Sequence, residues 1–263
     1  MSGRIALRCL ALGYLASLIV LPVGLVLLRT FAGGLGPVWD AVTRPAAVSA
    51  FWLTLTVALI AVPLNTIFGV LCAIVLVRHN FRGKSVLSAL IDLPLGVSPV
   101  VVGLALIVVY GRNTWFGGWL ADLGIRVIFA TPGMVLATIF VSLPFVVREV
   151  VPVLREIGTD QEQAASTLGS SPWQTFRLIT LPSIRTGVVY GVVLTTARAL
   201  GEFGAVSVVS GRLSGRTETL TLYVEDRFQS FDLTGAYAAS VVLALMAVAT
   251  LFAMNLFRPS EEH

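Results

Sequence analysis

Charged side chains inside an apolar segment are the residues of this chain most suited to chemistry. Arg198 and Glu202 are four residues apart within residues 186–210, a segment whose other residues are all uncharged. On a helix this spacing puts both side chains on one face, where they can form an ion pair. Two interpretations remain open. The pair can be structural and hold its helix to neighbouring helices, or Arg198 can offer positive charge to an anion on a pathway.

Other candidates for catalysis are weaker. Residues 78–85, RHNFRGKS, end like a phosphate-binding Walker A loop, but Arg78 stands where the first glycine is needed. The two cysteines form no CxxC pair, and the two histidines are far apart with no cysteines or carboxylates clustered around them. We therefore predict a non-catalytic chain with no cofactor and no metal site.

Composition indicates a membrane protein. Hydrophobic residues make up 56% of the 263-residue chain and charged residues only 12%, whereas about a quarter of a soluble domain is charged. A membrane-spanning helix needs about 20 apolar residues. Six segments meet or approach that length, the fifth of them despite its two charges: 9–28, 45–77, 93–111, 127–147, 186–210 and 233–257. The predicted fold is therefore an all-α membrane protein with six transmembrane helices.

Prolines and the first apolar run refine this prediction. The second segment is too long for one straight span, so Pro45 is expected to mark an end or a kink, with Pro63 as a second candidate. Pro94 and Pro99 are expected to bend the entry to the third helix. The first segment resembles a signal peptide, but it continues to Arg29 without a small-residue cleavage site and five more spans follow. We therefore interpret it as an uncleaved helix.

The arginines and lysines favour a cytoplasmic N-terminus, since cytoplasmic loops carry an excess of these residues. With that orientation nine lie inside, or ten if Arg148 reaches the inner surface, against seven outside. The inner ones are Arg4, Arg8, Arg78, Arg82, Lys84, Arg155, Arg177, Arg185 and Arg258, and the outer ones are Arg29, Arg44, Arg112, Arg126, Arg212, Arg216 and Arg227. The segment between the fourth and fifth helices is then cytoplasmic.

Small residues surround the charges of the fifth predicted helix. On a helical wheel Arg198 and Glu202 share one third of the circumference with Gly187, Gly191, Thr195, Gly201 and Ala205. Small residues mark the packing faces of membrane helices, so both charges are expected to point into protein or a water-filled cavity. Arg198 falls near the middle of the bilayer.

Three further charges lie near the ends of predicted spans. Arg148 and Glu149 follow the fourth apolar segment, and we expect Arg148 to snorkel to the inner surface or to contact a neighbouring protein. Asp92 precedes the third segment and is expected at the membrane edge.

The cytoplasmic segment reads as two short helices. Gly158 is expected to end the preceding helix. Thr159 with Glu162, or Asp160 with Gln163, has the spacing of a capping box that starts a new helix.

That first short helix carries Ala164, Ala165 and Leu168, and Gly169 is placed to end it in a left-handed turn. Ser171 and Pro172 then have the pattern of a second helix start, and that helix is expected to run to Pro182. An alanine face allows another surface to approach closely. An amphipathic helix lying on the lipid headgroups is the open alternative.

These residues resemble a motif of ABC importer permeases, in which Glu-Ala-Ala is followed by three residues, a glycine, nine residues and Ile-x-Leu-Pro. The matching positions are Gln163, Ala164, Ala165, Gly169, Ile179, Leu181 and Pro182. Gln163 replaces the motif glutamate, with Glu162 one position earlier. In that family the motif forms a coupling helix that docks into the ATPase subunit. The resemblance therefore implies a docking role for Glu162, Gln163, Ala164, Ala165, Leu168 and Gly169.

A second resemblance covers about residues 45–258. The stretches are SPVVVGLAL (98–106), LPFVVREV (143–150), TTARALGEFGAVSVVSG (195–211) and TETLTLYVEDRF (217–228). They are similar to the sulfate/thiosulfate (CysW-type) group of ABC importer permeases, whose sister group carries molybdate. The resemblance implies a type I importer transmembrane domain at 45–258 with the coupling segment at 159–182, after a first helix and external loop at 1–44 and before a tail at 259–263.

The same resemblance implies the function and the partners. It indicates the permease subunit of a sulfate/thiosulfate importer in the inner membrane of a bacterium, or else a permease for molybdate, tungstate or another oxyanion. The expected partners are two ATPase subunits, a second related permease and an extracytoplasmic binding protein. A stand-alone secondary transporter or channel remains the alternative from another class, although we find no convincing internal repeat of the kind such transporters carry.

Overall fold

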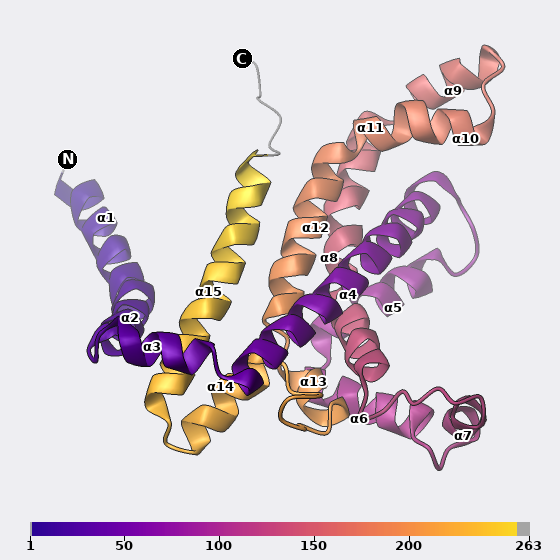
Figure 1. Cartoon of the computed structure of the whole chain (residues 1–263). Helices are drawn as coiled ribbons and strands as arrows, with labels where there is room; N and C mark the ends of the chain where they lie inside the picture. The colour runs from indigo at the N-terminus through magenta and orange to yellow at the C-terminus, as the bar shows by residue number, and fades with distance from the viewer. Residues whose placement is uncertain (1, 257–263) are drawn as a thin grey trace.

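The computed structural model describes residues 2–256, and all regular structure in that range is helical (Figure 1). Four helices are long and apolar enough to cross a membrane, and two bent helix pairs raise the number of spans to six. The six-span, all-α fold expected from the sequence is thus confirmed. The predicted tail at 259–263, the inner arginine Arg258 and the last residue of the sixth segment lie outside the described residues.

The helices follow one another along the chain with short connections. The first half contains α1 (Ser2–Leu15), the π-turn η1 (Ala16–Val20), α2 (Leu21–Phe31), α3 (Leu35–Val42), α4 (Pro45–Arg78), α5 (Lys84–Gly96), α6 (Pro99–Tyr110) and α7 (Trp115–Asp122). The second half contains α8 (Thr131–Ile157), α9 (Asp160–Thr167), α10 (Pro172–Thr175), the π-turn η2 (Phe176–Thr180), α11 (Leu181–Ser183), α12 (Arg185–Leu200), α13 (Gly204–Val209), α14 (Leu220–Gln229) and α15 (Leu233–Leu256).

Close packing of α8 between α4 and α12 forms the centre of the fold. Val146 of α8 lies against Gly69 of α4 and Gly191 of α12. A Cβ atom at Gly69 would come within 2.7 Å of the Val146 side chain, and one at Gly191 within 2.9 Å of its Cα. Without a hydrophobic force between helices in lipid, such small residues let the backbones approach and gain van der Waals contact.

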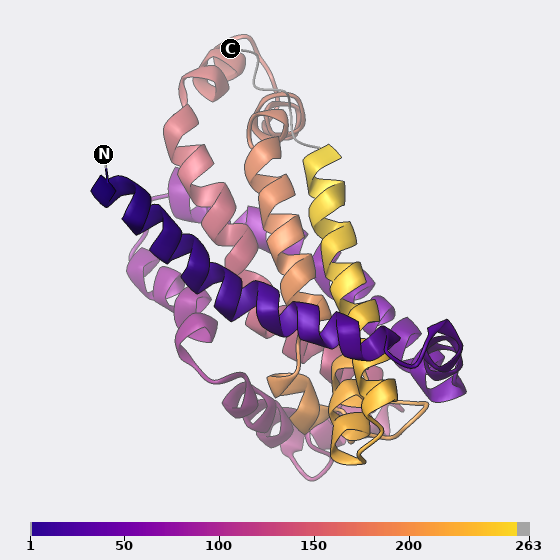
Figure 2. The ribbon, with the colours of Figure 1, turned by 90° about the vertical axis from the view of Figure 1, so that its left-hand side faces the viewer.

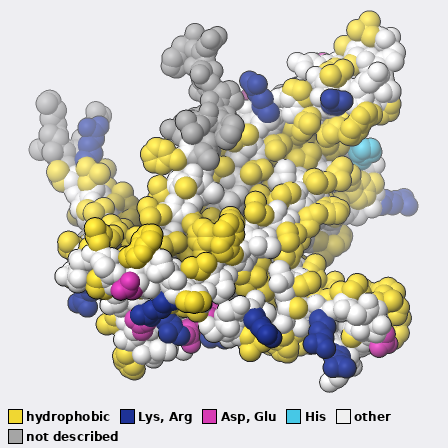
Figure 3. All heavy atoms as spheres, in the orientation of Figure 1, with side chains coloured by type: hydrophobic (Ala, Val, Ile, Leu, Met, Phe, Trp, Pro, Cys, Tyr) yellow, Lys and Arg dark blue, Asp and Glu magenta, His cyan; other side chains and the backbone are white. Residues whose placement is uncertain are grey.

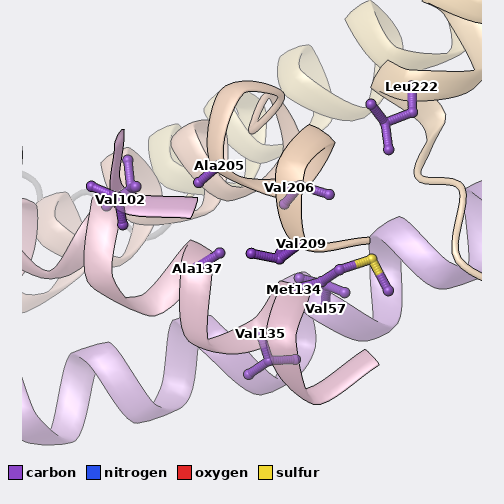
Figure 4. Packing of buried hydrophobic residues seen from close by; sticks show 10 residues of the cluster. Val57, Val102, Met134, Val135, Ala137, Ala205, Val206, Val209 and Leu222 are labelled. Atoms are coloured by element: carbon purple, nitrogen blue, oxygen red, sulfur yellow. The ribbon is translucent and has the colours of Figure 1, made fainter. Parts of the chain in front are cut away.

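A second core lies near the N-terminal end of α8. Val57 of α4, Val102 of α6 and Met134 of α8 are buried there together with Val206 and Val209 of α13 (Figure 4). This cluster attaches the short helix α13, which is too short to be stable alone, to three longer helices. It fixes the chain that leads out of α12.

The third span is broken, which corrects the single helix predicted at residues 93–111. It consists of α5 and α6, which meet at an angle of 114° across residues 97–98. The predicted bend at Pro99 is present but much sharper than expected. Pro99 forces the residue before it out of the helical region, and both Val97 and Ser98 have extended ψ angles, 136° and 131°.

The fifth span also differs from the continuous helix predicted at 186–210. It begins at Arg185 after a 69° bend from the preceding helices, and α12 ends at Leu200. Gly201, Glu202 and Phe203 are not helical, and α13 starts a new helix at Gly204. The helical wheel drawn over this segment is therefore wrong beyond Leu200, because Gly201 ends α12 and the Glu202 side chain begins α13.

The second span agrees better with prediction. Pro45 is the first residue of α4, where its missing N–H costs nothing. Pro63 lies inside α4, which continues past it to Arg78. The helices α3, α7 and α14, which lie in connections between the spans, were not predicted, because each is only 8 to 10 residues long.

The first span, α1 to α2, stands apart from the bundle and reaches it mainly beside α15 (Figures 1 and 2). Its start, the end of α15 and the segment α9–α11 lie at one end of the molecule, whereas α7, α13 and α14 lie at the other (Figure 1). On the face shown in Figure 3, charged side chains gather toward these two ends and hydrophobic ones cover the middle. We refer to the end with α9–α11 as the inner end.

Candidate functional site

The inner end carries the segment 159–183 as a helical hairpin. Gly158, with φ 69°, ends α8, and Gly169, with φ 86°, ends α9, as both were predicted to do. Ser171 and Gln174 form a complete capping box at α10: the Gln174 backbone N–H donates to the Ser171 hydroxyl, and its side chain accepts from the Ser171 N–H at 2.8 Å. The second helix runs through Pro182 and ends at Ser183, one residue later than predicted.

The start of α9 differs from the predicted capping box. Thr159 accepts a hydrogen bond at 3.0 Å from the side chain of Gln163. Glu162 turns away from the helix start and forms an ion pair with Arg78 at the end of α4, with 2.9 Å between Nε and Oε2. Its other oxygen accepts a 2.8 Å hydrogen bond from Thr180 of η2. A charged partner on a second element outcompetes a local cap, so Glu162 joins α4, α9 and η2.

The side chains of α9 separate into an inward and an outward set. Ala165 is only 7% exposed and packs inside the hairpin, whereas Leu168 is 86% exposed. Gln163 and Ala164 are also exposed. Of the residues predicted to form a docking face, Glu162 and Ala165 therefore hold the hairpin together. We call Gln163, Ala164, Leu168 and Gly169 the exposed face of α9.

The end of the sequence motif, residues 179–182, contains both exposed and buried side chains. Leu181 and Pro182 are exposed, and Ile179 is half-buried. Thr180 and Ile184, between and after them, are buried. Sequence reasoning missed these two anchors, because neither their type nor their spacing separates them from their exposed neighbours.

Arg198 and Glu202 form the predicted ion pair, with 2.6 Å between their charged groups. The Glu202 side chain is only 2% exposed. It also accepts a 2.8 Å hydrogen bond from the backbone N–H of Ala205, and its backbone carbonyl accepts one from Thr221 at 2.9 Å. The carboxylate therefore satisfies the start of α13 as well as the arginine, and these contacts favour the structural interpretation of the pair.

A second ion pair lies between α8 and α5. Arg148 was predicted to snorkel to the inner surface or to contact a neighbouring protein; within this chain its guanidinium binds both oxygens of Asp92, with 2.7 Å from Nε to Oδ1. The Arg148 side chain is 60% exposed. Sequence reasoning placed these two residues separately, because they are 56 positions apart.

The outer end has its own charged groups. A cleft of about 680 Å³ beside α7 is lined by Arg112 and Arg126, both exposed. In the loop before α14, burial raises the pKa of Glu218, and a hydrogen bond from Ser214 partly opposes this. Within residues 2–256, no three His, Cys, Asp or Glu side chains come close enough to hold a metal ion.

Burial would raise the pKa of Asp232, which precedes α15, but two partners lower it instead. The carboxylate accepts a 3.0 Å hydrogen bond from the Gly235 N–H and pairs with Arg44 at the start of α4. This ion pair fixes the outer end of α4 to α15.

Comparison with known proteins gives consistent matches. Residues 65–262 match the family described as the binding-protein-dependent transport system inner membrane component. The sulfate transport system permease protein CysW of Synechocystis is 48% identical over 98% of this chain and 93% of its own length. CysW of Escherichia coli K12 is 47% identical over 92% and 84%. Among solved structures, a bacterial alginate ABC transporter superimposes with a TM-score of 0.79 at 16% identity, covering 95% of this chain and 92% of its own.

Proposed function

Because the chain belongs to the family of binding-protein-dependent transport system inner membrane components, and within it to the CysW-type sulfate permeases, we propose that it is a permease subunit of an ATP-driven importer of sulfate or thiosulfate. The observation that carries this proposal is an identity of 47–48% with sulfate permeases over more than nine-tenths of the chain. The site of action is a bacterial inner membrane, with the N-terminus and α9 in the cytoplasm.

The exposed face of α9 supports a docking role toward an ATPase subunit. Leu168 projects from the inner end with almost its whole side chain exposed, and Ala164 beside it leaves room for a close partner. A helix laid into a groove is recognised through such apolar anchors spaced at i and i+4. Two ATPase subunits dock in this way, one on this chain and one on a related second permease, and an extracytoplasmic binding protein delivers the anion at the outer end.

The Glu162 contacts give a route for the motion that docking causes. Glu162 binds Arg78 of α4 and Thr180 of η2, and η2 leads through α11 into α12. A displacement of α9 therefore acts on two spans at once. Hydrolysis itself occurs in the ATPase subunit, and this chain converts closure of that partner into alternating access.

Uptake of labelled sulfate tests the proposal. The chain is expressed with its ATPase, second permease and binding protein in a strain that lacks its own sulfate importers. We expect uptake that requires ATP, that unlabelled thiosulfate inhibits and that molybdate inhibits weakly. Uptake of molybdate but not sulfate would overturn the assigned anion, and uptake that persists without the ATPase would indicate a stand-alone transporter.

A further inference from the structure

The ion pair between Arg148 and Asp92 lies within the length of α8 that can cross a membrane. Arg148 is about 26 Å along α8 from its outer end at Thr131 and about 14 Å from its inner end at Ile157. The hydrocarbon core is about 30 Å thick. For any placement of that core in which α8 crosses it completely, Arg148 lies within the core and on the inner side of its middle.

An exposed ion pair at this depth cannot face lipid. The Arg148 side chain is 60% exposed on this chain, and charged side chains within membrane spans face protein or a water-filled cavity. The bidentate contact with Asp92 also holds the guanidinium at its own depth, so it does not extend to the headgroups. This part of α5 and α8 therefore borders water or another protein.

The break in the third span lies on the same side of α5. Gly96 follows Asp92 by four residues, one turn further along the helix, and both Gly96 and Ser98 at the break are exposed. Irregular backbone at membrane depth is tolerated only where protein buries it or where it lines a water-filled cavity. Discontinuous spans of this kind border the substrate path in other transporters. Two independent features, a charge pair and a broken helix, thus mark one face.

We propose that Arg148 binds the tetrahedral dianion in the inner half of the pathway, with Asp92 as its resting counter-ion. This inference rests on the proposed function. The planar guanidinium that binds both oxygens of Asp92 fits two oxygens of a sulfate ion equally well. In a region of low dielectric, a fixed positive charge strongly lowers the energy of a passing dianion.

Asp92 prevents Arg148 from binding the anion too tightly for release. Conduction requires binding that is favourable enough for entry and weak enough for release. A carboxylate that competes for the same guanidinium meets both needs, because it neutralises Arg148 when no anion is present and displaces the anion afterwards. The nearest carboxylate in sequence, Glu149, is turned by about 100° around α8 from Arg148 and does not share its direction.

The test compares three variants in the complete importer: Arg148→Gln with Asp92→Asn, Asp92→Asn alone, and Arg148→Lys. The neutral double variant removes the positive charge without stranding Asp92. We expect it to assemble normally and to take up sulfate at least about tenfold more slowly than wild type. Asp92→Asn keeps the arginine but removes its competitor, so sulfate should be released more slowly and uptake should saturate at a lower sulfate concentration and a lower maximal rate than in wild type. Arg148→Lys should give a rate between those of wild type and the neutral double variant. Uptake by the wild-type importer is measured alongside, so that failure of the proposed function is seen separately.

Two results would overturn the proposal. One is wild-type uptake by the neutral double variant, since Arg148 would then only balance Asp92. The other is failure of that variant to assemble while Arg148→Lys assembles and transports at the wild-type rate, which would indicate a structural latch or a contact with the second permease. If the double variant does not assemble but Arg148→Lys assembles and transports slowly, the proposal is supported.

Discussion

The two arginine–carboxylate pairs of the membrane-spanning region use the same chemistry in opposite surroundings. Glu202 is buried, and besides Arg198 it satisfies the backbone at the start of α13. Arg148 and Asp92 bind only each other among the hydrogen bonds of the described residues, and Arg148 is largely exposed. These contacts favour a packing role for the first pair, and the exposure of the second supports the ligand-binding role that we propose for it. Burial and additional partners separate the two roles, whereas the charges themselves do not.

The largest expected difference is in stability. Glu202→Met should lower the free energy of unfolding by about 3–5 kcal/mol, because it leaves Arg198 with an uncompensated charge and removes the acceptor for Ala205. The neutral change at Arg148 and Asp92 should cost less than about 1 kcal/mol, as for other exposed pairs. Heating the purified proteins in detergent and measuring the folded fraction by size-exclusion chromatography compares them.

The double change Arg198→Met with Glu202→Met sharpens this prediction. It should recover only part of the lost stability, since the start of α13 still lacks its acceptor. Equal losses at the two pairs would mean that exposure on the single chain does not distinguish them.

The contact of Glu162 with Arg78 extends the comparison to the inner end. Like the Arg198–Glu202 pair, it is largely buried and has an additional partner, Thr180. Glu162→Gln should cost about 2 kcal/mol, because two charged hydrogen bonds become neutral or are lost. It should also loosen α9, so that ATP hydrolysis continues with less sulfate transported per ATP. Gln163→Glu is the matched comparison: it restores the motif glutamate on the exposed side, leaves the contacts of Glu162 in place and should not lower the amount of sulfate transported per ATP. Wild-type coupling in Glu162→Gln would contradict the proposal that Glu162 transmits the motion of α9 to α4 and η2.

At the inner end, Leu168 is the exposed residue that we expect to contact a partner. Leu168→Asp should leave the fold intact but weaken binding of the ATPase subunit by roughly ten- to hundredfold, the equivalent of one buried leucine side chain. Phe231→Asp is the control, because Phe231 is 88% exposed but lies between α14 and α15 at the outer end. Titration of the ATPase onto the purified permease measures both. Equal weakening by the two variants would argue against docking on the exposed face of α9.

The smallest effects concern pH at the outer end, where Asp232 is paired and Glu218 is buried. The lowered pKa of Asp232 means that its contribution to stability is complete above the ordinary value of 3.8 and is lost as pH falls through its folded-state pKa. The raised pKa of Glu218 has the opposite sign: stability is greatest below its ordinary value of 4.5 and declines as pH rises toward its folded-state pKa.

Thermal unfolding as a function of pH measures both terms. Asp232→Asn should flatten the loss of stability below about pH 4, and Glu218→Gln should remove the decline above pH 4.5. Unchanged pH profiles in both variants would contradict the assignment of these carboxylates.

Local features of the sequence predicted the fold and the hairpin best. Gly158, Gly169 and the Ser171 cap act within a few residues of themselves, and each is where it was expected. The number of spans also follows from composition, because length and hydropathy suffice to count them. Neither property gives the direction of a helix, so the 114° break between α5 and α6 was underestimated.

Side-chain partners far apart in sequence could not be predicted. Glu162 and Arg78 are 84 residues apart, and Arg148 and Asp92 are 56 apart. Each of these charges has several candidate partners until the helices are placed. The position of Ala165 inside the hairpin likewise depends on how α9 meets η2, which no pattern within α9 specifies.

The length of α4 gives its two terminal ion pairs a mechanical meaning. It is one helix of 34 residues, about 51 Å long, with Arg44 just before its first residue and Arg78 as its last. Arg78 is fastened to the hairpin at the inner end and Arg44 to Asp232 at the outer end. A rod held in this way acts as a lever: a tilt of only about 5° moves one end by roughly 4 Å relative to the other. A displacement at the inner end of α4 can therefore be transmitted to its outer end without any helix unfolding.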